Sequence, residues 1–333
     1  MRKVRNRKIC HNAESILKNH SLYLLLFFKS NLRFKNINIS HYSSYLWMIF
    51  CYSTIYNDSK MYIPDNSKYI DLYPSDTASH YLRVNTYRGF IFDDKYPYID
   101  KSRSFKIKRF FVRILLYTII FPLLTHIRMG LKIKGKHHLK TYKEELKDGA
   151  VSVSNHIHLW DYIAVMKALR PKNTYVLVWD KNINGKDGPS IRLVGGIPIP
   201  TLSKGVPIYN KALKEILSNK KILHVYAEGS MWEYYVPIRP FKTGAASIAI
   251  SNNKPILPIG FSYHKPGFIE KHLFRLKSCI TINIGKPIFK DDRLSRREAE
   301  IDLTRRAFVA VNRLVGISKP KYEPIYNNSK RID

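Results

Sequence analysis

The sequence has few cysteines and lacks the motifs of several common protein classes. Its cysteines, Cys10, Cys51 and Cys279, are scattered and form no C-x-x-C pair. This pattern argues against a disulfide framework and favours free buried thiols in a reducing compartment. A G-x-S-x-G motif is absent, so the chain offers no nucleophile of the α/β-hydrolase type. We also find no helix-turn-helix, zinc-finger or RNA-recognition signature.

Acidic residues are scarce. There are 25 Asp and Glu against 57 Lys and Arg, which gives a formal charge of +32. Part of this basicity fits a general enrichment in Lys, Ile, Asn and Tyr. The charge predicts an anionic partner, which can be nucleic acid, anionic lipid or a phosphorylated substrate. A non-catalytic, basic nucleic-acid-binding protein is the alternative from another functional class, but without a matching motif we expect no nucleic-acid partner.

The first 104 residues divide into two segments of different composition. Residues 1–60 carry ten Lys or Arg against two acids, and their apolar run at 22–28 lacks a signal-peptide cleavage site after it. We expect this extension to be weakly ordered or in contact with a membrane. Residues 61–104 are turn-rich and more acidic. An alternative is that translation starts at Met61, where the composition changes.

A basic and then apolar stretch follows at residues 105–130. Residues 101–113 contain six basic residues and no acid, and residues 114–127 contain no acidic or basic residue except His126. This uncharged run includes Pro122 and is shorter than the roughly 20 residues that a membrane-spanning helix needs. A buried core helix is one interpretation. We favour a helix that lies in the interface of an anionic membrane, because of the basic flank.

From residue 131 to 318 the pattern is that of an α/β domain with a mostly parallel mixed sheet flanked by helices. The expected strands are 131–135, 150–154, 174–179, 222–226, 256–263 and 279–285. The expected helices are 159–169, 209–217, 245–250 and 296–314, with a Gly-rich loop before residue 195. The sequence contains no internal repeat, and the basic tail at 319–333 is expected to be disordered.

The stretch Val151–Asp161 contains the first candidate catalytic pair. An apolar alternation ends at Asn155 and His156, and a helical pattern follows. If the whole stretch were helical, His156 and Asp161 would point roughly 140° apart. A working pair therefore requires His156 in the turn and Asp161 on the helix. There the carboxylate can hold one imidazole nitrogen while the other accepts a proton, as in general-base catalysis.

Two simpler interpretations compete with this pair. A lone His beside an Asp is usually part of a capped turn. A metal site can also start from His156-x-His158, but the H-x-H-x-D-H pattern would need Asp and His where the chain has Trp160 and Asp161. No further His or Cys cluster completes such a site. We therefore predict no metal, and His158 is expected at the surface or beside the site.

A second polar group follows the strand predicted at 222–226. Glu228, Gly229 and Ser230 come where this strand ends, so they are expected at the same sheet edge as His156. Arg239 and Lys242 follow near the start of a helix, where backbone N–H groups favour a phosphate. Taken singly, Glu228 is better explained as a helix-cap partner and Lys242 as a solvated lysine.

In combination these residues resemble the ordered blocks of the glycerolipid acyltransferases, and most closely the bacterial 1-acyl-sn-glycerol-3-phosphate (lysophosphatidate) acyltransferases. The resemblance spans about residues 105–290. Its blocks are Asn155-His156 with Asp161, Gly196–Ile199, Glu228–Ser230, Phe241–Ala245 and Ile256–Ile259. Five blocks in order at plausible spacing are a strong signal, whereas one H-x-x-x-x-D motif is weak.

The resemblance implies a glycerol-3-phosphate acyltransferase-like fold, preceded by interfacial helices, and an O-acyltransferase of phospholipid biosynthesis. His156 would deprotonate a lysophospholipid hydroxyl that attacks an acyl thioester, and Asp161 would support the imidazolium. Asn155 would support the catalytic residues without contacting the substrate. Glu228, Gly229 and Ser230 would hold the glycerol phosphate. No cofactor is implied, since acyl-CoA or acyl-carrier protein is the donor substrate. The implied location is the cytoplasmic face of the cell membrane.

The chain departs from the family pattern at two points. The arginine that usually ends the second block is absent, since Pro200, Thr201 and Leu202 stand there, and Met231 replaces the usual arginine of the third block. Arg192 or Arg239 can substitute for the missing phosphate ligand, together with Lys242. The acceptor that the resemblance implies is 1-acyl-sn-glycerol 3-phosphate, and glycerol 3-phosphate or another lysophospholipid is the alternative.

Overall fold

Seven strands form one mixed sheet in the computed structural model, which describes residues 61–326. The strand order is β1-β7-β6-β2-β5-β3-β4. The strands are β1 (Lys132–Lys134), β2 (Ala150–Ser154), β3 (Thr174–Val178), β4 (Gly196–Pro198), β5 (Ile222–Tyr226), β6 (Ile256–His264) and β7 (Cys279–Ile284). The five strands from β6 to β4 are parallel, and only β6 and β7 pair antiparallel. The predicted fold class, a mostly parallel mixed sheet, is confirmed.

The burial of the central strand β2 shows that helices or loops pack on both faces of the sheet. All of its residues are buried, and it pairs with β5 on one side and β6 on the other. A strand buried on both faces requires helices above and below the sheet, as is usual for parallel sheets. Because Ser154 pairs with Tyr226, β2 and β5 end side by side. The residues that follow these two strands therefore emerge at one edge.

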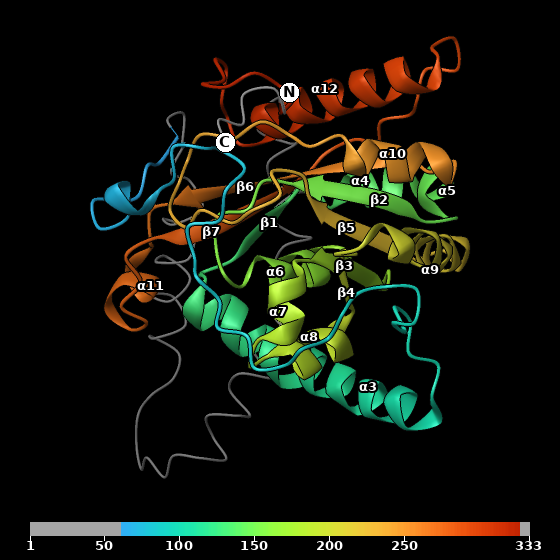
Figure 1. The fold of residues 1–333 in the computed structure, drawn as a ribbon. Helices are drawn as coiled ribbons and strands as arrows, with labels where there is room; N and C mark the ends of the chain where they lie inside the picture. The colour runs from blue at the N-terminus through green and yellow to red at the C-terminus, as the bar shows by residue number, and fades with distance from the viewer. Residues whose placement is uncertain (1–60, 327–333) are drawn as a thin grey trace. The chain divides into compact units, whose positions relative to one another are not determined.

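Helices cover the two faces of the sheet (Figure 1). On one face, α9 (Val206–Ser218), α10 (Gly244–Ser251) and α12 (Arg296–Leu314) share a core with Val151, Val153 and Leu223. On the other face lies α6 (Asp161–Ala168). The shorter helices are α4 (His137–Thr141), α5 (Lys143–Leu146), α7 (Asp180–Asn184), α8 (Gly188–Val194) and α11 (Phe268–His272), with single turns at Ile70–Leu72 and Ser203–Gly205. The α7 and α8 helices replace the loop predicted before residue 195.

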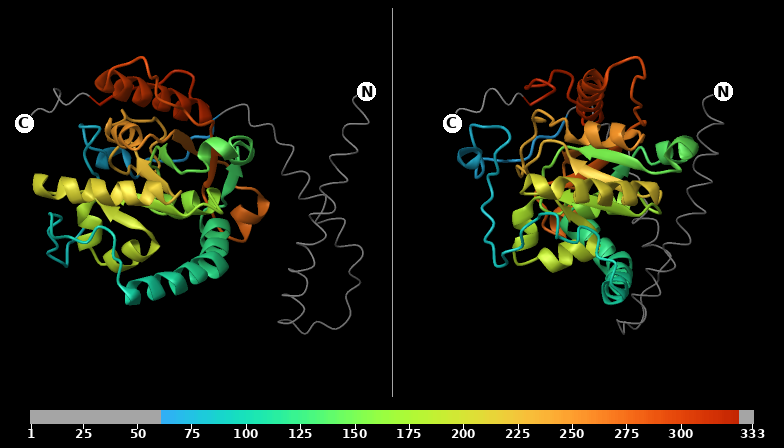
Figure 2. Two further views of the ribbon diagram at one scale, coloured as in Figure 1. Left: turned by 90° about the vertical axis from the view of Figure 1, so that its right-hand side faces the viewer. Right: turned by 45° about the vertical axis from the view of Figure 1, so that its right-hand side comes forward.

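A continuous helical stretch runs from residue 103 to 128, comprising α3 (Arg103–Leu115) and the π-turns Leu116–Ile120 and Leu123–Arg128. Its inner side packs Leu116 and Phe121 on Ile163 and Met166 of α6. Figures 1 and 2 show it on the side of the sheet opposite α12. Its outer side exposes large apolar residues, namely Ile107, Phe110, Phe111, Ile114, Leu115, Ile119, Leu123 and Ile127. We call this set the exposed stripe.

The alternative of a buried core helix at 114–127 therefore fits the inner face of this segment and not its outer face. The inner side is buried against apolar residues of α6. The outer side packs against nothing in the described chain. Between residues 61 and 326, no helix is both long and apolar enough to pass through a bilayer. The predictions for residues 1–60 lie outside the described residues, and so do Cys10 and Cys51. Cys279 is a free, buried thiol, as expected.

The turn-rich segment 61–104 and the first part of the basic tail both pack on the α/β domain. The described residues, 61–326, belong to one compact unit, which includes the turn-rich segment 61–104. The expected disorder of the basic tail is wrong for its first part, because Phe241 N–H donates to Pro324 and Tyr326 N–H donates to Phe241. This backbone pairing satisfies polar groups at a buried position and so fixes the tail as far as residue 326. Residues 327–333 lie outside the described residues.

Candidate active site

The turn after β2 is held open by Asn155. Its side-chain amide donates to the Phe261 carbonyl and its carbonyl oxygen accepts from Phe261 N–H, both at 2.8 Å. The buried side chain thus binds both polar groups of a β6 residue, as a neighbouring strand residue would. The backbone of the turn is released from the sheet at this point. The structure therefore places Asn155 as a support of the turn that presents His156.

His156 and Asp161 form the predicted pair. His156 lies in the turn and Asp161 is the first residue of α6, and His156 Nδ1 lies 3.1 Å from Asp161 Oδ2. The same Oδ2 accepts N–H bonds from Ile157 and His158, at 2.9 and 3.0 Å. An oxygen that accepts these bonds also requires a proton on Nδ1, which leaves the lone pair on Nε2. Nε2 is therefore the nitrogen that can accept a proton from a substrate.

Burial sets the charge state of the pair. The Asp161 side chain is fully buried, whereas the His156 side chain is 20% exposed and so remains reachable. Burial lowers the pKa of His156 more than the Glu228 carboxylate raises it, and Arg239 adds to the lowering. Burial raises the pKa of Asp161, against the backbone N–H donors that lower it. A neutral imidazole at neutral pH is the form a general base requires.

The ring of Tyr226, the last residue of β5, stacks on the imidazole and was not predicted. The two ring centroids are 3.7 Å apart at an angle of 10°. The Tyr226 hydroxyl is buried without a hydrogen-bond partner, and burial raises its pKa well above the ordinary value. The stacking restricts rotation of His156. A large aromatic residue at the end of a strand that exits beside His156 was the available sequence signal.

Glu228 and Arg239 form a buried ion pair beneath the turn. Their side chains are 3% and 1% exposed, and Arg239 Nη2 lies 2.8 Å from Glu228 Oε2. That oxygen also accepts from His156 N–H at 3.0 Å, and Oε1 accepts from Arg239 N–H at 2.9 Å. The parallel pairing of β2 and β5 thus brings Glu228 to the His156 turn, at the sheet edge where it was predicted. In this structure the carboxylate positions the His156 backbone.

The remaining bonds of Arg239 are also made within the protein. Its guanidinium donates to the Thr77 carbonyl at 2.9 Å and to both the hydroxyl and the carbonyl of Ser230, which is itself buried. The same group packs over the Trp232 ring at 4.4 Å. Since almost none of this side chain reaches solvent, the prediction that Arg239 binds a substrate phosphate does not fit the structure.

Gly229 and Lys242 lie together at the edge of this cluster. Gly229 adopts a φ of +79°, which favours glycine, and a Cβ there would come within 2.8 Å of Lys242 Nζ. The Lys242 backbone is tied to Ala227 by a 2.8 Å hydrogen bond, while its side chain is exposed. Of the three predicted phosphate ligands, Lys242 is thus the one whose charge lies at the surface beside Glu228-Gly229.

Arg192 contacts a different part of the chain. Its guanidinium donates to the Tyr96 hydroxyl and, at 2.7 Å, to the Pro97 carbonyl. It also packs over the Tyr96 ring at 4.9 Å. None of these contacts is with a residue of the His156 turn. Arg192 therefore fastens the segment 61–104 to α8, and the structure does not bring it together with the other predicted residues.

Residues 73–81 add groups to the site that sequence reasoning missed. The Trp232 indole donates to the Ser79 carbonyl at 2.9 Å, and Tyr73 stacks on Trp232. His80 stacks on Trp179 with centroids 3.8 Å apart. Burial first, and then Lys242, Arg239 and His156, lower the pKa of His80 to about 4. The aromatic residues of this segment were visible in the sequence, but their partners lie far along the chain.

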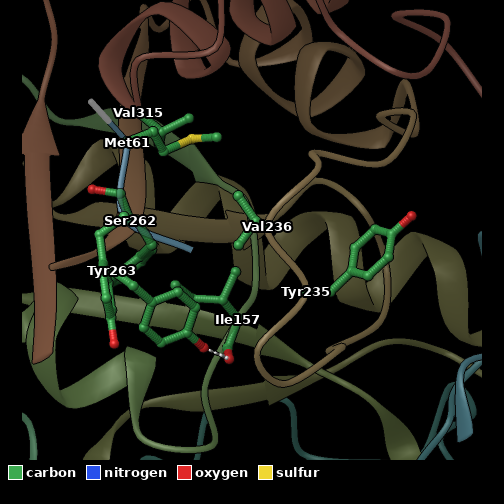
Figure 3. A pocket seen from close by; sticks show the side chains of 9 residues that line it. Met61, Ile157, Tyr235, Val236, Ser262, Tyr263 and Val315 are labelled. Carbon is green, nitrogen blue, oxygen red and sulfur yellow. Dashed lines mark hydrogen bonds between the residues drawn. The ribbon is translucent and has the colours of Figure 1, made fainter. Parts of the chain in front are cut away.

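A small apolar cavity lies behind the turn (Figure 3). It measures about 10 Å³ and is lined by Met61, Ile157, Val236, Tyr263 and Val315, among others. A space of this size holds about one water molecule. It is therefore too small for an acyl chain. Figure 3 also shows the Tyr263 hydroxyl donating to the carbonyl of Ile157, the residue after His156; the bond measures 2.7 Å.

Comparison with known proteins finds a family model that matches the segment containing this site. Residues 130–262 match the model of the family described as Acyltransferase. Among solved structures, the chain is similar to the crystal structure of the 1-acyl-sn-glycerophosphate (LPA) acyltransferase PlsC from Thermotoga maritima. That similarity has 16% sequence identity and a TM-score of 0.40, and it covers 65% of this chain and 85% of the other. No curated protein sequence matches the chain. The matched segment contains His156, Asp161, Glu228 and Lys242.

Proposed function

Because residues 130–262 form a domain of the acyltransferase family, we propose that this chain is an O-acyltransferase that acts on a lysophospholipid. The proposed acceptor is 1-acyl-sn-glycerol 3-phosphate, and the product is phosphatidate. Acyl-CoA or acyl-carrier protein supplies the acyl group as a thioester, and no cofactor takes part. The observation that carries the proposal is the 3.1 Å contact between His156 Nδ1 and Asp161 Oδ2, which leaves a neutral, accessible Nε2.

The chemistry follows from this arrangement. His156 Nε2 takes the proton of the acceptor hydroxyl while the oxygen attacks the thioester carbonyl. The resulting tetrahedral intermediate expels the thiolate, which receives the proton back from the imidazolium. The buried Asp161 carboxylate stabilises the imidazolium between these two steps, since it already accepts the Nδ1 proton. Glu228 holds the His156 backbone in position for both steps.

We further propose that the enzyme binds an anionic membrane surface, the cytoplasmic face of the cell membrane, and catalyses acyl transfer there. The exposed stripe supports this part, because Phe110 and Phe111 are 61% and 63% exposed on a helix that also carries basic residues. An apolar face flanked by cations suits the interface of anionic lipids. The lysophospholipid can then enter the site, and the product can leave it, while both stay in the membrane. Lys242 is proposed to contact an anionic group of a substrate, since its side chain is exposed beside Gly229.

The test is acyl transfer by purified protein from acyl-CoA or acyl-carrier protein to lysophosphatidate, with glycerol 3-phosphate and other lysophospholipids as parallel acceptors. His156→Ala and Asp161→Asn are expected to lower kcat by about a hundredfold or more, because the general base or its support is lost. His137→Ala, which changes an exposed histidine on α4, is the matched control. Equal turnover by the two site variants and wild type would show that this pair is not the catalytic base.

A further inference from the structure

A second cavity lies beside the catalytic turn and belongs to none of the predicted motifs. It measures about 210 Å³. A cavity needs only about 10–15 Å³ to hold one water molecule, so this one has room for a group of many heavy atoms. Its lining includes the polar residues Arg128, His158, Tyr234, Tyr263, Arg275, Lys277 and Ser278. We call it the basic cavity, because no acidic residue lines it.

The sheet topology brings the three cations of the basic cavity to the catalytic edge. Because β7 is antiparallel to β6 and β1 is parallel to β7, both begin at the edge where β6 ends. Arg128 comes shortly before β1, and Arg275 and Lys277 come shortly before β7. This is the edge at which β2 ends and His156 emerges, since β2 and β6 are parallel.

Direct contacts join the basic cavity to the turn that holds His156. His158 lines the cavity and lies two positions after His156. Tyr263, also in the lining, donates its hydroxyl to the Ile157 carbonyl, as Figure 3 shows, and accepts from Tyr234 N–H at 3.0 Å. The wall of the cavity and the backbone of the turn are therefore parts of one hydrogen-bonded unit.

The cations of the cavity have no acidic partner within ion-pair distance in the described part of the chain. Arg128, Arg275 and Lys277 are all exposed, and the described ion pairs include none of them. Glu233 Oε1 lies 3.8 Å from His158 Nε2. Lys277 attracts the Asp65 carboxylate through its charge, but the two side chains form no ion pair. Two guanidinium groups, an ammonium group and nearby hydroxyls are the donors that recognise a phosphate.

The position of the cavity connects it with a lipid. Arg128 directly follows Ile127, the last residue of the exposed stripe, at the end of the helical stretch 103–128. Arg275 holds a φ of +54°, an uncommon conformation for a residue other than glycine, in the tight connection that precedes β7. A head group at the surface that the stripe contacts would meet the cations at this end of the helix.

We infer that the basic cavity binds a phosphate group of a substrate of acyl transfer, through Arg128, Arg275 and Lys277. The inference rests on the proposed function. Its position at the end of the exposed stripe favours the phosphate of the lipid acceptor. The phosphates of a CoA or phosphopantetheine donor are the other source of the same chemistry. Binding here holds the acceptor hydroxyl close to His156 Nε2 and leaves the proton transfer itself to that imidazole.

The test compares Arg275→Ala/Lys277→Ala with Arg297→Ala/Arg305→Ala, which removes two exposed arginines from α12. With acceptor and donor varied separately, the cavity variant is expected to raise KM for lysophosphatidate at least about tenfold, with kcat within about twofold. Its KM for an uncharged monoacylglycerol should not change. A rise in KM for the donor instead would support the cavity and assign it to the donor phosphates. Unchanged KM values, or the same rise in the control, would overturn the inference.

A second measurement separates this inference from the proposed function. Calorimetric titration with glycerol 3-phosphate and with free CoA reports binding without turnover. We expect one of the two to bind wild type and His156→Ala equally, and to lose at least about tenfold in affinity in the cavity variant. Absence of acyl transfer by wild type would end the proposed function but would leave this result standing. Equal affinity in wild type and the cavity variant for both probes, with matching melting temperatures, would overturn the basic cavity as a phosphate site.

Discussion

A buried arginine, Arg239, and the three cations of the basic cavity all lie near the His156 turn, and they differ in how their charge is balanced. Arg239 is buried and bound to Glu228, Ser230 and Thr77. The cations of the basic cavity are exposed and lack acidic partners among the described ion pairs. A buried guanidinium is stable only with partners that replace water, so its charge is used inside the protein. Exposed cations keep their water, and a phosphate can displace it.

This comparison shows why position in a motif does not establish what a cation binds. Arg239 lies close in sequence to Glu228, and that proximity made it a candidate phosphate ligand. The same proximity lets its guanidinium meet the Glu228 carboxylate at 2.8 Å. Arg275 and Lys277 stand outside every block of the resemblance, yet the antiparallel strand β7 brings them to the sheet edge where His156 lies. The three predictions below test each side of this comparison.

The largest expected effect concerns the stability of the buried pair. Arg239→Ala should lower the free energy of unfolding by about 3–5 kcal/mol, because the Glu228 carboxylate stays buried without its partner. Arg275→Ala should change it by no more than about 0.5 kcal/mol, as is usual at exposed positions. Urea unfolding of both variants measures the difference. If Arg239→Ala does not fold, Glu228→Gln/Arg239→Met should recover part of the loss, since no charge remains unpaired. Equal stability of Arg239→Ala and wild type would show that the pair is not structural.

The second effect concerns the helix that leads to Arg128. Phe110→Asp/Phe111→Asp should weaken sedimentation with phosphatidylglycerol vesicles by roughly tenfold or more, because two exposed aromatic rings no longer enter the interface. Val309→Asp, which alters an exposed apolar residue of α12, is the control and should bind as wild type does. If the stripe variant and the control bind equally, helix 103–128 is not the lipid-contacting element. The basic cavity would then need a soluble phosphate ester as its ligand.

The smallest expected effect is on the pH dependence of activity. Burial holds the pKa of His156 below the ordinary value of 6.5, so the imidazole stays neutral as pH falls to that value. The acid limb of kcat/KM should therefore lie below pH 6.5. Glu228→Gln removes the charge that raises this pKa, so the limb should move to lower pH. An acid limb above 6.5 in wild type would mean that the Asp161 carboxylate outweighs burial.

Much of the fold was predictable because it depends on local patterns. The strand at 222–226 and the helix at 296–314 have the predicted bounds, and the capping box at Ser295 and Glu298 starts that helix. The α7 and α8 helices were missed, because Gly185, Gly188 and Pro189 indicate a loop while Pro189 in fact occupies the first turn of α8. The pairing of the tail with Phe241 had no local signal at all.

By itself, the sequence indicated the resemblance to the acyltransferases, the mostly parallel sheet, and the placement of His156 in a turn and Asp161 on a helix. These features depend on periodicity and on the order of short motifs, which neighbouring residues encode. Only the tertiary structure decided that Arg239 neutralises Glu228, that Tyr226 stacks on His156, and that Arg128, Arg275 and Lys277 meet in one cavity. Strand pairing and burial set these contacts, and both join residues whose separation along the chain gives no sign of their distance in space.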